Sequence, residues 1–421
     1  MSVTTAPATG AATRRPRGSL WYGVLAGGMA VGLGCFLYQW SQGLGVTGLS
    51  NTISWGMYII TFMFLVGVSA GGLIVVAGAE LVDSQRFELL TRLAVIVSGT
   101  AIAAAAVSIV PDLGRPQLIW KMLRQPHWTS PLIWDVIIIT VYLSIAALDL
   151  WILTRRPPRP RAMRTMAFVA LPAAVLVHSI TAWIFGLLVA RPFWNTALLA
   201  PMFISSALVS GTALLLLVAH VVDRTTDWDP GERAFPDLAR LMVWFIGVDA
   251  FFLFAEILTT YASGVPDHLK QLNVLLVGRL APVFWVEVVL GVVLPFAIFA
   301  SRLRERRTWV VAAAALALLG VFFKRINIVM TSMFEPLVGL EPGIPGGRAG
   351  QAFAPDPIYV PTWVEWGVLI GIASLVGLLI TLGVRAFVVP RARPAGRDDL
   401  SSPHDVDHRG SLDPIDGDQY G

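Results

Sequence analysis

The chain has 421 residues, of which 56% are hydrophobic and only 14% are charged, and its mean hydropathy is +0.70. A soluble globular domain carries about 25% charged residues, so this composition excludes an ordinary soluble enzyme and predicts a polytopic membrane protein. The formal net charge is only +4, and Arg and Lys in membrane loops explain it without a nucleic-acid partner.

The apolar stretches have the length of membrane-spanning helices. About 20 residues of helix cross roughly 30 Å of hydrocarbon, whereas a membrane barrel would show short alternating strands. We therefore expect an all-α integral membrane protein with about ten transmembrane helices. The first span is followed by others and has no small-residue cleavage signal, so we interpret it as retained. The predicted spans are residues 19–40, 54–82, 90–110, 132–153, 165–189, 197–222, 237–262, 278–300, 309–327 and 363–387.

Basic residues are distributed unevenly between the connections. Cytoplasmic loops retain Lys and Arg, and more than two thirds of the 31 basic residues fall in the connections on the side of the N-terminus. This bias predicts that both termini lie in the cytoplasm, and it places the chain in the cytoplasmic (inner) membrane of the cell. Residues 1–17 and 391–421 are rich in Pro, Ala, Gly or charged residues, so we expect disordered cytoplasmic tails flanking a membrane domain of residues 18–390.

The scarcity of metal-binding residues limits the cofactors that this chain could hold. Cys35 is the single cysteine, so the chain cannot build a disulfide, a cysteine-ligated iron-sulfur cluster or covalently attached haem by itself. Haem b needs paired histidines at similar depth, and the two histidines within spans, His178 and His220, are predicted to differ in depth by roughly 15 Å. We therefore predict no haem, iron-sulfur cluster or metal in this chain.

Several ionisable residues fall within or at the ends of the predicted spans. Each costs at least a few kcal/mol in hydrocarbon, so each is a functional candidate. Asp249 and Glu256 are seven residues apart, which puts them on one helix face about 10 Å from each other. Buried salt bridges and a proton path both explain such residues, and the sequence leaves the two open. Three polar residues, Lys324, Arg325 and Asn327, are expected to end the ninth span. The candidates for a proton path are Glu80, Asp149, Asp249, Glu256, Arg279 and Glu287.

One connection between spans is unusually polar. The segment PDLGRPQLIWKMLRQPHWTSPLIWD, residues 111–135, carries five charged or titratable side chains before the next span begins. These are Asp112, Arg115, Lys121, Arg124 and His127.

This segment and two others carry a family resemblance. Together with WGMYIITFMFLVGVSAGGLI at residues 55–74 and KRINIVMTSMFEP at residues 324–336, it resembles the NrfD/PsrC family of integral membrane subunits, over most of residues 19–387. The resemblance implies two four-helix bundles, at about residues 54–189 and 197–327, flanked by the first and last helices. Family members anchor respiratory complexes such as polysulfide reductase and exchange electrons with quinone.

The resemblance also implies partners and a site. We expect a four-cluster ferredoxin-like iron-sulfur subunit, a molybdopterin catalytic subunit, and menaquinone or another quinone as the bound substrate. His can exchange a proton near neutral pH, Tyr can hydrogen-bond a carbonyl, and Asp can orient either. Headgroup contacts from Tyr58 and His178, supported by Asp112, Arg115 and Asp135, are the hypothesis for the quinone site.

Two alternatives remain open. A secondary transporter would also carry acidic residues within its bundle, but it would show broken spans at corresponding places in two repeats. Pro172, Pro201 and Pro295 interrupt three of the spans and show no such pairing. A purely structural anchor with a degenerate quinone site differs from the first hypothesis in activity alone.

Overall fold

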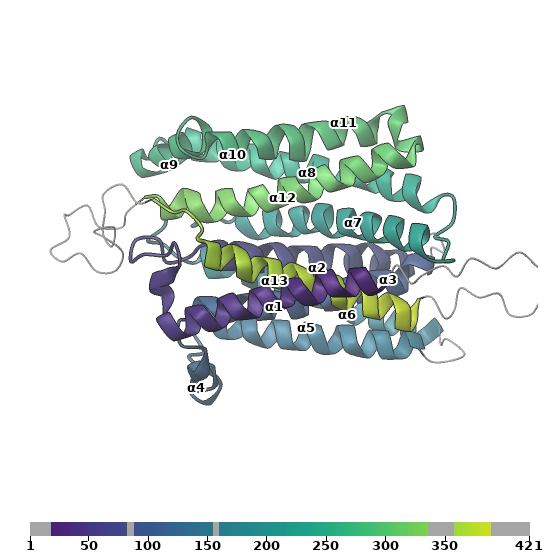
Figure 1. Ribbon diagram of the computed structural model, residues 1–421. Helices are drawn as coiled ribbons and strands as arrows, with labels where there is room; N and C mark the ends of the chain where they lie inside the picture. The colour runs from purple at the N-terminus through teal and green to yellow at the C-terminus, as the bar shows by residue number, and fades with distance from the viewer. Residues whose placement is uncertain (1–17, 82–87, 155–159, 336–357, 389–421) are drawn as a thin grey trace, which may run out of the picture.

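The computed structural model describes residues 18–81, 88–154, 160–335 and 358–388, and within these residues every regular element is helical (Figure 1). Among these described residues, ten helical segments are long and apolar enough to span a membrane, which confirms the predicted number. Helices satisfy all their backbone hydrogen bonds internally, as hydrocarbon requires. The predicted tails, residues 1–17 and 391–421, lie outside the described residues. The spans are α1 (Gly18–Gln42), α2 (Met57–Leu81), α3 (Glu88–Ile109), α5 (Pro131–Thr154), α6 (Pro160–Gly186), α7 (Leu199–Thr225), α8 (Ala234–Ala262), α10 (Ala281–Val286) continued by η5 (Glu287–Val293) and α11 (Leu294–Ala300), α12 (Arg307–Met333) and α13 (Trp363–Phe387).

Shorter helices occupy the connections. Figure 1 shows α4 projecting from one end of the molecule, and that end, to which the 111–130 connection belongs, is called the PDLGRP end below. A positive φ of 64° at Gly114 lets the chain turn sharply between two of these elements. The connecting helices are η1 (Leu44–Val46), η3 (Val110–Leu113), η4 (Pro116–Leu118), α4 (Ile119–Arg124), α9 (Pro266–Leu276) and η6 (Arg302–Glu305).

Helix α2 is the central helix of the fold. In its most apolar stretch, 83% of the residues are buried. The helix packs against α3, α6 and α7. Small residues permit this burial, because Gly71 and Gly72 of α2 lie directly against Ala207 and Gly211 of α7. A Cβ atom at Gly71 would collide with the Ala207 carbonyl oxygen. The two helix backbones therefore meet without side chains between them.

Helices α1 and α13 form an antiparallel pair on one side of this core (Figure 1). Near the middle of the pair, Gly32 packs directly on Gly371. Near the start of α1, the Trp21 indole Nε1 donates a 3.1 Å hydrogen bond to Thr381 Oγ1. Since Trp21 begins α1 and Thr381 lies near the end of α13, both ends of the described chain emerge on the same side of the molecule.

The eighth span contains a π-helical segment. Seven residues from Glu287 to Val293 form it, between α10 and α11, and Gly291 within it packs directly against Gly320 of α12. Such segments widen a helix by one residue per turn and are frequent at functional sites. Here the π segment begins at an acidic residue that is buried inside the span.

The ninth span is longer than its sequence indicates. The prediction that Lys324, Arg325 and Asn327 end this span is wrong, because α12 continues to Met333 and all three side chains are buried. These polar side chains can be buried inside the span because side chains on other spans bind them. Pro172 lies inside α6, which continues as one helix to Gly186, and Pro295 lies in the first turn of α11 directly after the π segment. Pro201 lies in the first turn of α7, where its missing N–H costs little.

Candidate functional site

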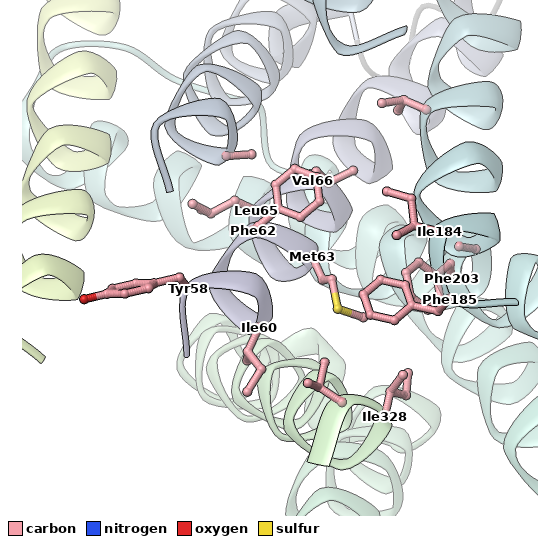
Figure 2. Close-up of a cluster of buried hydrophobic side chains, with 14 of the residues drawn as sticks. Tyr58, Ile60, Phe62, Met63, Leu65, Val66, Ile184, Phe185, Phe203 and Ile328 are labelled. Carbon is pink, nitrogen blue, oxygen red and sulfur yellow. The ribbon is translucent and has the colours of Figure 1, made fainter. Parts of the chain in front are cut away.

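The PDLGRP end contains a buried chain of hydrogen bonds that joins three elements. The Tyr58 hydroxyl, in the first turn of α2, donates to Gln39 Oε1 at 2.5 Å, and Gln39 Nε2 donates to the Pro111 carbonyl at 2.7 Å. Gln39 lies in the last turn of α1, and Pro111 lies in η3 where α3 ends. Figure 2 shows that Tyr58 points away from the apolar cluster around Met63 and Phe185, with its hydroxyl toward α13. Tyr58 therefore presents its polar end outside the apolar core.

A fully buried carboxylate on α13, that of Glu365, lies near this series of hydrogen bonds. Glu365 accepts hydrogen bonds from the Gly48 backbone N–H at 2.8 Å and from the Tyr359 hydroxyl at 2.5 Å, and it also completes a capping box with Thr362. The Tyr359 oxygen in turn accepts from the Met57 backbone N–H at 2.7 Å. Burial, and secondarily the nearby Glu365 carboxylate, raise the pKa of Tyr359, so its hydroxyl remains a donor. These contacts tie the start of α13 to the start of α2.

Asp112 completes the group of polar side chains. It is half-buried in η3, and its Oδ1 atom is buried with no hydrogen-bond partner in the structure. Electrostatic interactions connect Asp112 with Tyr58 and with Glu365. A buried carboxylate oxygen without a partner is uncommon, and it leaves a position at which a ligand could donate a hydrogen bond.

A pocket of about 200 Å³ lies beside this group, between α1, the α3–η3 corner and α13. Apolar residues and glycines form its whole lining, although Pro111 also supplies the carbonyl that binds Gln39. The pocket thus adjoins the polar cluster at Pro111, while Leu33 and Val107 of its lining are exposed on the outer surface of the fold. The lining residues are Met29, Gly32, Leu33, Phe36, Val107, Val110, Pro111, Val368, Gly371, Ile372 and Leu375.

Two other predicted site residues lie deeper, between α5 and α6. Asp135 accepts a 2.7 Å hydrogen bond from the Thr181 hydroxyl, and His178 Nδ1 lies 3.0 Å from the Ala174 carbonyl. His178 is buried against the backbone of Gly67, nine residues along α2 from Tyr58, which is about 13 Å of helix. Its Nε2 atom has no hydrogen-bond partner. The structure therefore brings Tyr58 and Asp112 together and places Asp135 and His178 at a second, deeper level.

The fifth predicted residue, Arg115, is exposed on the connection between η3 and η4. The adjacent surface carries two more basic side chains, since Lys121 and Arg124 are also exposed on α4. This part of the connection faces away from the buried cluster, and its charges are available to a partner that docks on the PDLGRP end.

A network of buried ions lies between α7, α8, the π segment and α12. Lys324 Nζ is 2.6 Å from Asp249 Oδ2, and Ser205 donates to Asp249 Oδ1 at 2.9 Å. One helical position further on, Arg325 donates to Ser206 Oγ at 2.7 Å and lies 4.2 Å over the Phe203 ring. The Asp249–Lys324 pair is desolvated, so removing either member would leave an uncompensated charge.

The same network borders a small cavity whose lining is mostly apolar. Asn327 Nδ2 donates to Glu287 Oε2 at 2.6 Å, whereas Glu287 Oε1 and Asn327 Oδ1 have no partner. A cavity of about 20 Å³ lined by both residues, together with Lys324 and Glu256, is large enough for one water molecule. Glu256 accepts from Thr196 at 3.0 Å on the opposite wall. Polar groups therefore continue from the PDLGRP end of α7 to the ion pair inside the bundle.

The remaining predicted path residues lie apart from this network. Glu80 is half-buried in the last turn of α2, and Asp149 is buried near the end of α5. Arg279 is exposed before α10, with its guanidinium 5.7 Å from the centre of the Phe334 ring. In the described ranges, no group of three or more His, Cys, Asp or Glu side chains has the arrangement of a metal site.

Three residues of the polar cluster were not predicted from the sequence. Gln39 and Tyr359 are uncharged at neutral pH, and Glu365 lies in the first turn of a predicted span, where an acidic residue usually reaches water. The signal that could have found Glu365 is the sequence TWVE at residues 362–365, which has the spacing of a capping box. The burial of Glu365 could not be read from it.

Known proteins match most of this chain. A family model described as "Polysulphide reductase, NrfD" matches residues 45–336. A protein of Halobacterium salinarum, named as a membrane subunit of dimethyl sulfoxide reductase, is 35% identical over 89% of this chain and 92% of its own length. The Hdr-like menaquinol oxidoreductase integral membrane subunit of Archaeoglobus fulgidus is 27% identical, with 85% and 90% covered. A selenate reductase subunit of Mesobacillus selenatarsenatis is 24% identical, with 87% and 93% covered.

Proposed function

Because the chain belongs to the polysulphide reductase NrfD family, we propose that it is the quinone-interacting membrane subunit of a respiratory oxidoreductase complex. The observation that carries the proposal is the buried group of Tyr58, Gln39, Asp112 and Glu365 beside a hydrocarbon-facing pocket. A quinone needs the same combination, because its ring carries two carbonyl oxygens and its tail is an apolar chain. The name of the Archaeoglobus relative, a menaquinol oxidoreductase subunit, supports menaquinone as the substrate, although another quinone would fit the same groups.

The predicted site residues have roles at two depths, at the PDLGRP end and further inside the bundle. The Tyr58 hydroxyl, which donates to Gln39 Oε1 in the structure, exchanges this acceptor for a ring carbonyl when the quinone binds. Asp112, through its unpartnered oxygen, accepts or returns a proton. Asp135 and His178 lie deeper and hold protons that pass between the ring and the bundle, since His178 keeps one ring nitrogen without a partner. Arg115, on the exposed connection, contacts the partner subunit.

Electrons must pass to or from a neighbour of this chain. With Cys35 as its single cysteine, the chain cannot provide the thiolates that hold an iron-sulfur cluster. We propose that a four-cluster ferredoxin-like subunit docks on the PDLGRP end and links the quinone to a molybdopterin catalytic subunit. The exposed Arg115, Lys121 and Arg124 provide charges for that docking.

The proposal includes an orientation in the cytoplasmic membrane. Both ends of the described chain lie on one side, and the bias of Lys and Arg assigns that side to the cytoplasm. Burial of Lys324 and Arg325 removes two basic residues from the opposite side and strengthens the bias. We further propose two four-helix bundles, one of α2, α3, α5 and α6 and one of α7, α8, α10–α11 and α12, with α1 and α13 flanking them.

Proton transfer through the second bundle is part of the same proposal. Glu256, the small cavity, Glu287 and the Asp249–Lys324 pair form a polar route, and Glu80 and Asp149 serve the cytoplasmic side of the first bundle. Arg279 is exposed apart from this route and exchanges protons with the opposite side only if the route extends to it. This ion network also favours a second candidate function, ion translocation by the chain alone as a secondary transporter. The two differ in whether the chain works in a complex.

Purification and turnover together test the proposal. A tagged chain extracted in mild detergent is expected to co-purify with iron-sulfur and molybdopterin subunits. His178→Ala is expected to abolish quinol-linked turnover while leaving dye-linked activity of the soluble subunits intact. Isolation of the chain without partners would favour the transporter, and unchanged quinol-linked turnover in the variant would rule out the role of His178.

A further inference from the structure

The pocket between α1, η3 and α13 has three walls, and on each wall apolar lining residues give way to a polar residue toward the PDLGRP end. On α1 the lining residue Phe36 is followed one turn later by Gln39, and on α13 the lining residue Val368 is preceded one turn earlier by Glu365. On η3, Pro111 is followed directly by Asp112. Three separate elements therefore place an apolar side chain in the pocket and a polar one just beyond it, at the PDLGRP end.

The pocket runs along the helices and opens toward the surrounding hydrocarbon. Its lining on α1 extends from Met29 to Phe36, which is about 10 Å of helix, and its lining on α13 covers the same length. Two lining residues face outward, since Leu33 is 59% exposed and Val107 is 46% exposed. A chain-like apolar molecule could therefore enter sideways from the bilayer and lie parallel to the helices.

We infer that this pocket holds the first isoprenoid units of a quinone tail, with the ring directed toward Gln39, Asp112 and Glu365. The inference rests on the proposed function and adds to it the route by which the substrate enters and the elements that bind its tail. Gln39 is then a positioning residue, because its hydrogen bonds to Tyr58 and Pro111 fix the Tyr58 hydroxyl at the polar end of the pocket.

The charges at the polar end favour a quinone over a phospholipid. The side chains that border this end are two carboxyl groups, an amide and a phenol, Asp112, Glu365, Gln39 and Tyr58. Carboxylates repel the phosphate of a lipid headgroup, whereas a quinone ring is neutral and accepts hydrogen bonds. An acyl chain and an isoprenoid chain would fit the apolar part equally well, so the polar end decides between them.

Substitutions that fill the pocket test this inference in the complete complex. Leu375→Trp and Val107→Trp each place an indole ring in the lining, at least one helical turn from the residues of the polar cluster. The KM for a long-chain menaquinol is expected to rise about tenfold, the scale of lost apolar contacts, while the KM for tailless menadiol changes less than about twofold. Leu148→Trp, at an exposed position on α5, serves as the matched control and is expected to leave both values unchanged.

The outcomes separate this inference from the function on which it rests. If the wild-type complex oxidises or reduces neither quinone, the proposed function fails. If the wild-type complex is active and the pocket variants affect both substrates equally, or neither, the tail assignment alone fails. A menaquinone carrying a photoreactive group on its tail provides a second measurement, with labelling expected on α1 and α13. Labelling there by a photoreactive phospholipid that excess menaquinone does not displace would overturn the assignment.

Discussion

Tyr58 donates its hydrogen bond across a helix interface to Gln39, which passes the connection on to the Pro111 carbonyl. The tyrosine is completely buried, and yet its hydroxyl lies at the boundary between the apolar core and a group of polar side chains. This single relationship joins α1, α2 and η3 and places a hydroxyl donor beneath the polar 111–130 connection.

Removal of that hydroxyl should affect catalysis more than stability. Tyr58→Phe keeps the ring and its packing but deletes the donor to the quinone carbonyl, so quinol-linked turnover is expected to fall about a hundredfold. Tyr142→Phe is the matched control, because that buried hydroxyl binds Ser98 in the same half of the molecule, away from the pocket. Turnover in membranes, normalised to the amount of assembled complex, measures both. Equal losses in the two variants would show that Tyr58 has a structural role only.

The Asp249–Lys324 pair should dominate the stability of the second half of the protein. Lys324→Met leaves Asp249 charged and unpaired inside the bundle, and a loss of about 3–5 kcal/mol of unfolding free energy is expected. The double variant Lys324→Met with Asp249→Leu should recover most of it. Thermal unfolding of the purified complex measures the series. Lys270→Met, which breaks an exposed pair with Asp267, should cost below about 0.5 kcal/mol. A double variant no more stable than Lys324→Met would contradict this interpretation.

Glu287→Gln tests the proton path separately from electron transfer. The amide keeps the size of the side chain and a polar contact with Asn327, but it cannot carry a proton through the small cavity. Quinol-linked electron transfer should continue, while the number of protons moved per electron should fall. Proton movement in sealed vesicles, measured with a pH-sensitive dye, provides this ratio. An unchanged ratio would mean that the buried network only holds the bundle together.

The Tyr359 hydroxyl should stabilise the protein equally across the usual pH range. Burial and Glu365 raise the pKa of Tyr359, so its contribution is complete below the unfolded phenol pKa of about 10 and is lost only at higher pH. Tyr359→Phe should therefore cost about 1 kcal/mol, with the same difference from wild type at about pH 6 and about pH 9. Thermal unfolding at both pH values measures it. A difference that shrinks at the higher value would indicate that the phenol ionises there.

Substitution of Gly71 should prevent assembly of the two halves. A leucine at this position would push α2 away from the Ala207 carbonyl, with a loss of several kcal/mol as helix packing fails. Gly78 provides the control on the same helix, because a Cβ atom there meets no neighbouring atom within 4 Å, and Gly78→Ala should be neutral or slightly stabilising. The amount of chain recovered in membranes and its size-exclusion profile report the outcome. Normal recovery of Gly71→Leu would contradict the close packing of α2 on α7.

The membrane spans could be predicted because each one satisfies a single physical requirement, a length of apolar sequence that covers the hydrocarbon. The end of α12 could not, since the polar run at Lys324 resembles the end of a span and only its partners on other helices show otherwise. Those partners, Asp249 and Glu287, were identified as buried candidates. Which base each acid would meet depended on how α7, α8 and α12 pack, and no local pattern encodes that.

The residues of the candidate site that the sequence singled out are mostly titratable side chains in or beside the spans, and a neutral amide was missed. Tyr58 and Asp112 were predicted together, and the structure places them in one electrostatic group. Gln39 was missed because a neutral amide at the end of a span usually faces water. His178 was expected beside Tyr58, yet rotation and depth along α2 separate the two levels by about two and a half turns, which sequence spacing on different helices cannot show. The quinone role of all these residues stays a prediction.

The backbone contact between Gly71 and Gly211 has a mechanical consequence. Because the α2 and α7 backbones already touch at this seam, a tilt of one helix toward the other would bring atoms into collision, and this close packing favours the two halves moving as one piece. Alternating-access machines depend on one half rocking against the other. A rigid frame of this kind suits a protein in which the traffic is confined to small molecules, protons and electrons, while the helices themselves stand still.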